Sequence, residues 1–271
     1  MSDLQSDDLE TEAQRLAEDA RKPARRVRPR LARALSRGED VEVETPHGPV
    51  MAWRLGAGPA TLLVHGWNDD NALWSPLIDA CEHLGRAVVA FDLPGHGWSP
   101  SEAYSLEAAG EAALAVAQTL GPMDSIVAHS FGCPTSLYAL SHGLVVPRAV
   151  MIGSPVPRTK EIDRYNADWD REMIQDGMDP EVVARAGEIL RAQLADPESA
   201  FMNIDKTIAG MTAKALILHS FDDDACPVAN AQAMADLWPG AELFLTDELG
   251  HRLIAQDHAT VQRIVDFVEG L

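Results

Sequence analysis

The sequence predicts an α/β protein built on a doubly wound, mostly parallel sheet, and two regularities support this prediction. Short apolar runs, of the kind that a parallel sheet buries on both faces, recur from residue 60 onward. Stretches with helical periodicity lie between most of these runs. Strand–helix alternation of this kind is typical of an open sheet with helices on both faces.

The first predicted element of the sheet is a β-hairpin. Residues Val41–Thr45 and Val50–Leu55 alternate in polarity and flank a Pro-His-Gly-Pro turn. Further strands are expected at Ala60–Val64, Ala87–Phe91, Ser125–Ala128, Ala149–Ile152, Ala215–His219 and Leu243–Leu245. Helices between them are expected at Ala72–Leu84, Leu106–Leu120 and Ala229–Trp238.

One interval, residues 155–210, breaks this rhythm because it lacks a clear buried strand. It carries helix-like runs at Val182–Leu194 and near Ala200–Ile208. A segment inserted after a strand should lie over the carboxyl edge of the sheet, where open α/β folds bind their ligands. We therefore expect residues 155–210 to form a small helical cap; an ordinary pair of surface helices is the alternative.

The first 40 residues form a charged N-terminal arm that differs from the domain at 41–271. Residues 1–20 are mostly acidic, and apolar residues recur at helical spacing from Leu9 to Ala20, which predicts a short amphipathic helix. Residues 21–37 hold eight basic residues and no acidic one. Since no aromatic residue is interleaved with the arginines, we favour an arm lying on the chain's own acidic body over a nucleic-acid or membrane contact.

The composition of the 271-residue chain excludes several classes of protein. Hydrophobic residues make up 46%, enough to bury a core, yet no apolar run approaches the roughly 18–20 residues that cross a bilayer. We expect no secretory signal at the polar start of the chain, and a net charge of −20 argues against nucleic acid as a partner. The widely spaced Cys81, Cys133 and Cys226 predict reduced thiols in a cytoplasm, not disulfides or a zinc site.

The strongest local signal is the sequence Ala-His-Ser-Phe-Gly at residues 128–132. An apolar strand runs into it and a helix-like stretch follows, which is the setting of a nucleophile elbow. The positions two before and two after the serine must be small, because the strand and helix nearly touch there. Gly132 fits, and Ala128 adds one methyl group to the usual glycine. We expect Ser130 to be a nucleophile; the alternative is a serine in an ordinary βα loop.

A second signal, His-Gly-Trp, follows the predicted strand Ala60–Val64. Gly66 allows the backbone to turn so that the amide of Trp67 points at a reacting carbonyl group. Acyl transfer needs two such amides aimed at the developing oxyanion, and we predict those of Trp67 and Phe131. The alternative is a strand-end turn without a ligand, and we interpret His65 as structural.

A third signal is the Gly- and Pro-rich loop at residues 91–99, which follows a predicted strand. Its Asp92 and His96 resemble catalytic groups in type. Loops of this composition usually need side chains to satisfy their backbone groups, so we interpret both residues as structural.

A serine nucleophile needs a base, and the base needs a carboxylate that orients it. Three consecutive aspartates, Asp222, Asp223 and Asp224, follow one predicted strand, and a Gly-His step at His251 follows the last strand. We expect His251 to be the base and one of the aspartates to be the acid. A cation site at the aspartates is the rival interpretation, but no further ligands follow at EF-hand spacing.

Five segments together resemble the α/β-hydrolase-fold family, in its Ser-Asp-His, esterase- and lipase-like form. They are LLVHGW, FDLPGHGWS, AHSFG, LILHSFDDDACP and ELGHRL, and they occur in the family's order. In this family the catalytic aspartate commonly stands four residues before a proline, so Pro227 selects Asp223, and the Gly-His step selects His251. The resemblance also implies an eight-stranded, mostly parallel sheet, a cap after the sixth strand, and a reaction without a cofactor or metal. It does not cover the N-terminal arm.

The function implied is a serine hydrolase that cleaves carboxylic esters through an acyl-enzyme intermediate. An apolar small-molecule ester is the expected substrate, with Trp98, Tyr165 and Trp169 as candidate substrate-binding residues because large apolar side chains suit such a group. Core and cap packing is the alternative role for these three. Two other functions stay open: the same triad acting on a C–C bond, thioester or peracid, and a ligand-binding protein that does not catalyse a reaction. The sequence carries no prediction of oligomeric state.

Overall fold

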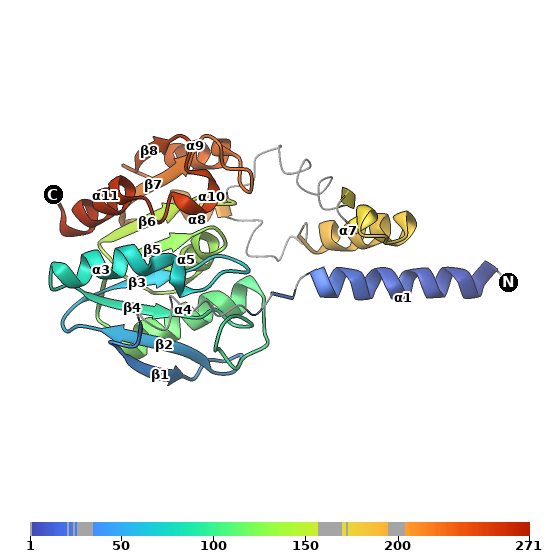
Figure 1. Ribbon diagram of the computed structural model, residues 1–271, viewed down its shortest axis with the longest axis horizontal. Coiled ribbons are helices and arrows are strands. Elements are labelled where there is room, and N and C mark those ends of the chain that lie inside the picture. Colours follow the sequence, from blue (N-terminus) through green and yellow to red (C-terminus); the bar gives the residue numbers. More distant parts are fainter. Residues whose placement is uncertain are drawn as a thin grey trace.

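The computed structural model describes residues 2–20, 22–23, 25, 35–156, 170–171, 173–194 and 204–271. Within these residues the centre of the molecule is an eight-stranded sheet in the order β1-β2-β4-β3-β5-β6-β7-β8 (Figure 1). The strands are β1 (Glu39–Val43), β2 (Val50–Leu55), β3 (Ala60–Val64), β4 (Ala87–Phe91), β5 (Met123–His129), β6 (Arg148–Ile152), β7 (Lys214–Ser220) and β8 (Glu242–Thr246). The β1–β2 and β2–β4 pairs are antiparallel and the remaining pairs are parallel, which confirms the predicted sheet.

The register of the parallel strands brings their carboxyl ends to one edge of the sheet. Val64 of β3 pairs with both Phe91 of β4 and Ala128 of β5, and Ile152 of β6 pairs with His129 on one side and Leu218 on the other. Every residue of β3 and β4 is buried, as expected for strands covered on both faces. The segments that carry the predicted catalytic residues therefore leave the sheet side by side.

Helices cover the sheet on both faces, with a separate apolar core on each side. Helices α3 (Ser75–His83) and α11 (His258–Glu269) share one core, centred on residues such as Trp74 and Ile264. The other core contains residues of α4 (Leu106–Leu120), α5 (Gly132–Ser141), α8 (Ile204–Ala209) and α9 (Val228–Leu237). This layering confirms the doubly wound architecture.

Two helices that cover the sheet, α3 and α11, differ from the sequence prediction. The stretch expected as one helix at 72–84 is divided into a 3₁₀ turn, η1 (Asn71–Trp74), and α3, because Pro76 occupies the first turn of a new helix. Helix α11 was not predicted, although Asp257 caps its first turn by accepting from the Thr260 amide.

The N-terminal helix α1 (Ser2–Ala20) is longer than predicted and packs along α7 (Pro180–Leu194). Ala13 and Ala17 lie against Val182 and Ala186, and the guanidinium of Arg185 contacts the Glu10 carboxylate at 2.7 Å. Figure 1 shows this pair extending to one side of the sheet, while α8 packs back against α5 and α9. Of the described helices within residues 155–210, α7 thus lies beside α1 and α8 lies against the body.

The described residues of the arginine-rich segment contact the body of the chain. The Arg25 guanidinium lies 3.4 Å from the Ser101 carbonyl oxygen, and Arg37 pairs with Asp79 at 2.8 Å and Glu82 at 2.6 Å. These contacts agree with the expectation that the arm lies on the acidic body. The basic residues Arg21, Arg26, Arg28, Arg30 and Arg33 lie outside the described residues.

No helix in the described part of the chain is long and apolar enough to span a bilayer. The three cysteines are free and buried. Burial raises the pKa of the Cys81 thiol to about 11 and that of Cys133 to about 12, so both are protonated, unreactive thiols at neutral pH.

Candidate active site

Ser130 occupies a strained turn between β5 and α5. Its φ of 52° lies in the left-handed region, which a side chain other than glycine rarely adopts. The turn is held because the Ser130 amide donates to the Ile152 carbonyl oxygen at 2.9 Å. A Cβ at Gly132 would lie only 2.2 Å from the Val64 carbonyl oxygen, so β3 and the start of α5 meet too closely for any side chain. This is the geometry of a nucleophile elbow.

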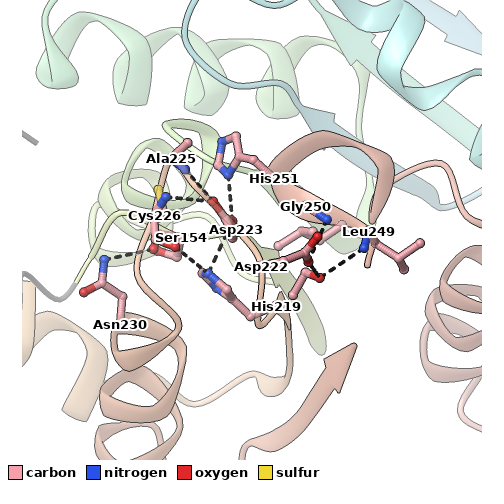
Figure 2. A network of polar contacts seen from close by, with 12 residues as sticks. Ser154, His219, Asp222, Asp223, Ala225, Cys226, Asn230, Leu249, Gly250 and His251 are labelled. Atoms are coloured by element: carbon pink, nitrogen blue, oxygen red, sulfur yellow. Dashed lines mark hydrogen bonds and ion pairs between the residues drawn. The ribbon is translucent and has the colours of Figure 1, made fainter. Parts of the chain in front are cut away.

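His251, in the short helix α10 (Gly250–Leu253), contacts Asp223, which follows β7. The His251 Nδ1 atom lies 2.8 Å from Asp223 Oδ2 (Figure 2). The other carboxylate oxygen accepts from the amides of Ala225 at 2.9 Å and Cys226 at 2.7 Å. Burial on its own acts to raise the pKa of Asp223, but the His251 contact and the Cys226 amide outweigh it and leave that pKa lowered. The carboxylate is therefore ionised and holds the imidazole by Nδ1.

The two neighbouring aspartates have other surroundings. Asp222 accepts from the Gly250 amide at 3.0 Å and from the Ser220 hydroxyl (Figure 2). It therefore fastens the segment after β8 that carries His251, residues 247–253 and here called the histidine loop, to the end of β7. Asp224 is exposed. Of the three aspartates, Asp223 is the one whose carboxylate contacts His251.

His129 supplies a second support for His251, which the sequence interpretation did not assign to it. Its Nε2 lies 2.8 Å from the His251 carbonyl oxygen, and the two rings lie 4.7 Å apart. Burial and the neighbouring His251 lower the pKa of His129 to about 4, so the ring is neutral at physiological pH. Next to it, Arg252 forms an ion pair with Asp69 at 2.7 Å, joining the histidine loop to the loop after β3.

The nucleophile side of the site is open by comparison. The hydroxyl of Ser130 makes no hydrogen bond to another described residue, whereas its Cβ lies next to Gly66, where an added Cβ would approach to 2.8 Å. Contacts between catalytic groups are often long before substrate binds. His129 links the two residues instead, because it directly precedes Ser130 in the sequence and hydrogen-bonds the carbonyl oxygen of His251.

The two residues whose amides are the predicted oxyanion donors are in contact on this open side. The rings of Trp67 and Phe131 pack edge to face with their centroids 5.2 Å apart. Among the described residues, neither the Trp67 amide nor the Phe131 amide has an acceptor. Two amides without acceptors beside an elbow serine are what an oxyanion hole requires.

Of the predicted substrate-binding residues, the structure describes Trp98, which lies apart from this group. Trp98 is 41% exposed and packs against Trp53 of β2, with ring centroids 5.5 Å apart. Because β4 and β3 separate β2 from β5, this contact lies toward the antiparallel end of the sheet, away from the elbow. Tyr165 and Trp169 lie outside the described residues.

The polar residues interpreted as structural do satisfy loop backbone groups. His65 accepts from the Leu93 amide at 3.1 Å, and Asp92 accepts from the Trp98 amide at 2.9 Å. His96 accepts from the Asn68 amide at 3.1 Å, and burial lowers its pKa to about 3. Within the described residues there is no cluster of three His, Cys, Asp or Glu side chains arranged to hold a metal ion.

Known proteins share this architecture. The family model described as alpha/beta hydrolase fold matches residues 59–181. An esterase from Pyrococcus furiosus superposes with a TM-score of 0.70 at 17% identity, covering 92% of this chain and 96% of its own. A carboxylesterase from Bacillus subtilis gives 0.67 at 20% identity, over 89% and 96%. The chain thus has the α/β-hydrolase fold.

The relatives found by sequence align with smaller parts of this chain than these two structures do. An uncharacterized protein of Mycobacterium tuberculosis is 30% identical over 52% of this chain, so the match spans about half, 54%, of that relative's length. The pimeloyl-[acyl-carrier protein] methyl ester esterase of Xanthomonas campestris is 26% identical over 73% of this chain and 89% of its own.

Proposed function

We propose that this protein is a serine hydrolase that cleaves carboxylic esters of small molecules through an acyl-enzyme intermediate. The observation that carries the proposal is the Asp223–His251 hydrogen bond of 2.8 Å at the sheet edge where Ser130 sits in a left-handed turn. An ionised acid, an oriented imidazole and an elbow serine are the parts of a Ser-His-Asp triad.

The proposed reaction begins when Ser130 Oγ attacks the ester carbonyl carbon while His251 Nε2 takes the hydroxyl proton. Asp223 orients the ring and stabilises its charged form, and the Trp67 and Phe131 amides donate to the oxyanion. His251 then gives its proton to the departing alkoxide, leaving the acyl group on Ser130. A water molecule, deprotonated by His251, attacks that acyl group and releases the acid and the free serine.

Substrate choice is inferred from charge and from the relatives. The net charge of −20 slows the approach of anionic substrates, so we propose a neutral, apolar ester as the substrate. The esterase names among the relatives and structural neighbours favour this bond over a C–C bond, thioester or peracid. In this proposal residues 155–210 form the cap, and Tyr165 and Trp169 contribute to substrate binding. No cofactor takes part, and the enzyme works in a reducing cytoplasm, as its three free cysteines suggest.

The test is hydrolysis of p-nitrophenyl esters of graded acyl length by the wild type, Ser130→Ala and His251→Ala. We expect turnover by the wild type and loss of at least about 10³-fold in both variants. A serine-directed fluorophosphonate should label the wild type and not Ser130→Ala. Labelling without ester turnover would redirect the proposal to another bond. Absence of both labelling and turnover would refute it in favour of a ligand-binding protein.

A further inference from the structure

A second imidazole lies beneath the acid of the proposed triad. His219, in β7, is fully buried, and its Nε2 lies 2.9 Å from the Cys226 carbonyl oxygen. The same nitrogen lies 3.3 Å from Asp223 Oδ2, the oxygen that also contacts His251. Figure 2 shows His219 and His251 approaching Asp223 from different sides. The proposed reaction uses Ser130, His251 and Asp223 and leaves His219 without a part.

The contacts of His219 determine where its proton is. A carbonyl oxygen only accepts hydrogen bonds, so Nε2 must carry the hydrogen that Cys226 receives. In a neutral ring Nδ1 is then bare, and this atom is buried without a partner. A charged ring would bury a second N–H group without an acceptor, and burial indeed lowers the pKa of His219. His219 is therefore neutral and presents one N–H dipole to the acid loop and to Asp223.

We propose that His219 is a positioning residue that holds the acid loop and lowers the basicity of Asp223, and so sets the pH range over which His251 works as a base. This inference rests on the proposed function. Asp223 Oδ1 already accepts from two amides, and His251 Nδ1 donates to Oδ2. The negative charge on Oδ2 therefore determines how strongly the charged His251 ring is stabilised. A donor dipole 3.3 Å from Oδ2 withdraws part of that density.

The direction of the effect follows from this arrangement. Without the His219 N–H, Oδ2 is more negative and stabilises the charged His251 ring more strongly, so the proton leaves His251 only at higher pH. Besides Asp223, the groups facing His251 are the neutral His129 from β5 and the Arg252–Asp69 ion pair beside it. A substitution at residue 219 leaves the contacts of these groups with His251 in place. The acid limb of kcat/KM should therefore move upward.

Two amide side chains make a matched test. In His219→Gln the amide nitrogen reaches the place of Nε2 and retains the donor, whereas in His219→Asn it reaches only the place of Nδ1. Both variants bury one amide group. We expect His219→Asn to raise the pH midpoint of the acid limb of kcat/KM by about half to one unit, the size expected for a weakened polar contact. Because the loop that carries Asp223 also loses the donor to the Cys226 carbonyl oxygen, kcat should fall about tenfold with KM unchanged. His219→Gln should lie close to the wild type in both respects.

A readout that does not depend on turnover separates this proposal from the one it rests on. The hydrogen between His251 Nδ1 and Asp223 gives a far-downfield proton NMR signal. The pH midpoint at which this signal changes should be higher in His219→Asn than in the wild type, and close to the wild-type value in His219→Gln. An unchanged midpoint and acid limb in a folded His219→Asn protein would overturn the proposal, as would equal loss of kcat in both variants. If the wild type neither hydrolyses esters nor reacts with a fluorophosphonate, the proposed function fails, while the NMR titration still decides the role of His219.

Discussion

The acid half and the nucleophile half of the candidate site are built in opposite ways. Around Asp223, both carboxylate oxygens have donors, and the histidine loop is fastened by Asp222, His129 and Arg252. Around Ser130, the hydroxyl and the amides of Trp67 and Phe131 have no partners among the described residues. The Asp223 carboxylate finds its donors within the protein, whereas the groups around Ser130 would find theirs in the reacting group of the proposed function.

This difference indicates which part of the site is already held in place before a substrate binds. Buried polar groups without partners cost free energy, so a fold retains them where a ligand will supply the missing contacts. The Asp223 carboxylate has no such vacancy, because each of its oxygens already has a donor. Substitutions in the two halves should therefore fail for different reasons.

The largest expected effect distinguishes neighbouring aspartates within the acid half. Asp223→Asn should lower kcat by about 10⁴-fold, because an amide cannot stabilise the charged imidazole and disturbs its orientation. Asp222→Asn retains an oxygen that can accept from the Gly250 amide, and should cost less than about fivefold. Steady-state kinetics on one p-nitrophenyl ester decides between them, and equal losses would contradict the assignment of Asp223 as the acid.

In the nucleophile half, the sharpest variant is Gly66→Ala. Its Cβ would lie 2.8 Å from the Ser130 Cβ and 3.2 Å from His129 Nδ1, so the serine must shift. Misplacement of a reacting group by about 1 Å can cost about 10²-fold, and we expect a loss of that size in kcat/KM. Gly210→Ala is the control, since its added Cβ would meet only ordinary contacts at 3.5 Å. Similar activity in both variants would show that the elbow tolerates the crowding.

The smallest effect concerns stability toward acid. Burial lowers the pKa of His96 to about 3 and that of His129 to about 4, and it also lowers that of His219. In the unfolded chain these rings bind protons near pH 6.5, so the unfolded state binds more protons between pH 6.5 and 4. The free energy of unfolding should therefore fall as the pH drops through this range, by up to about 1.4 kcal/mol per pH unit for each ring.

Urea unfolding at pH 7, 6 and 5 measures this fall in stability. His129→Gln removes one buried proton-binding site and should make the dependence shallower. Asp223 acts in a lower window, because its lowered pKa affects stability only as the pH falls below the usual aspartate range. A dependence as steep in His129→Gln as in the wild type would contradict the contribution of that ring.

Sequence patterns predicted the strands well, because a strand buried on both faces reads as a short apolar run. Strands β2, β3 and β4 begin and end at the predicted residues. The catalytic candidates could also be predicted, since each stands just after a strand in a local motif. The supporting residues could not be predicted in this way. His129 and Asp222 contact residues distant in sequence, and no spacing rule relates His129 to a carbonyl oxygen 122 positions away. The contacts of His219 with Asp223 and Cys226 depend on how the loop after β7 folds back.

The pairing of α1 with α7 bears on how this protein can be shortened. The packed surface of α7 includes Val182, Ala186 and Ile189, and its described helical partner is α1. A variant that begins near residue 35 would leave this stripe facing water while the sheet stays intact. Such a protein would be prone to self-association rather than inactive in its chemistry. Size-exclusion chromatography of this shortened variant beside the full chain would measure how far α1 keeps the apolar surface of α7 from water.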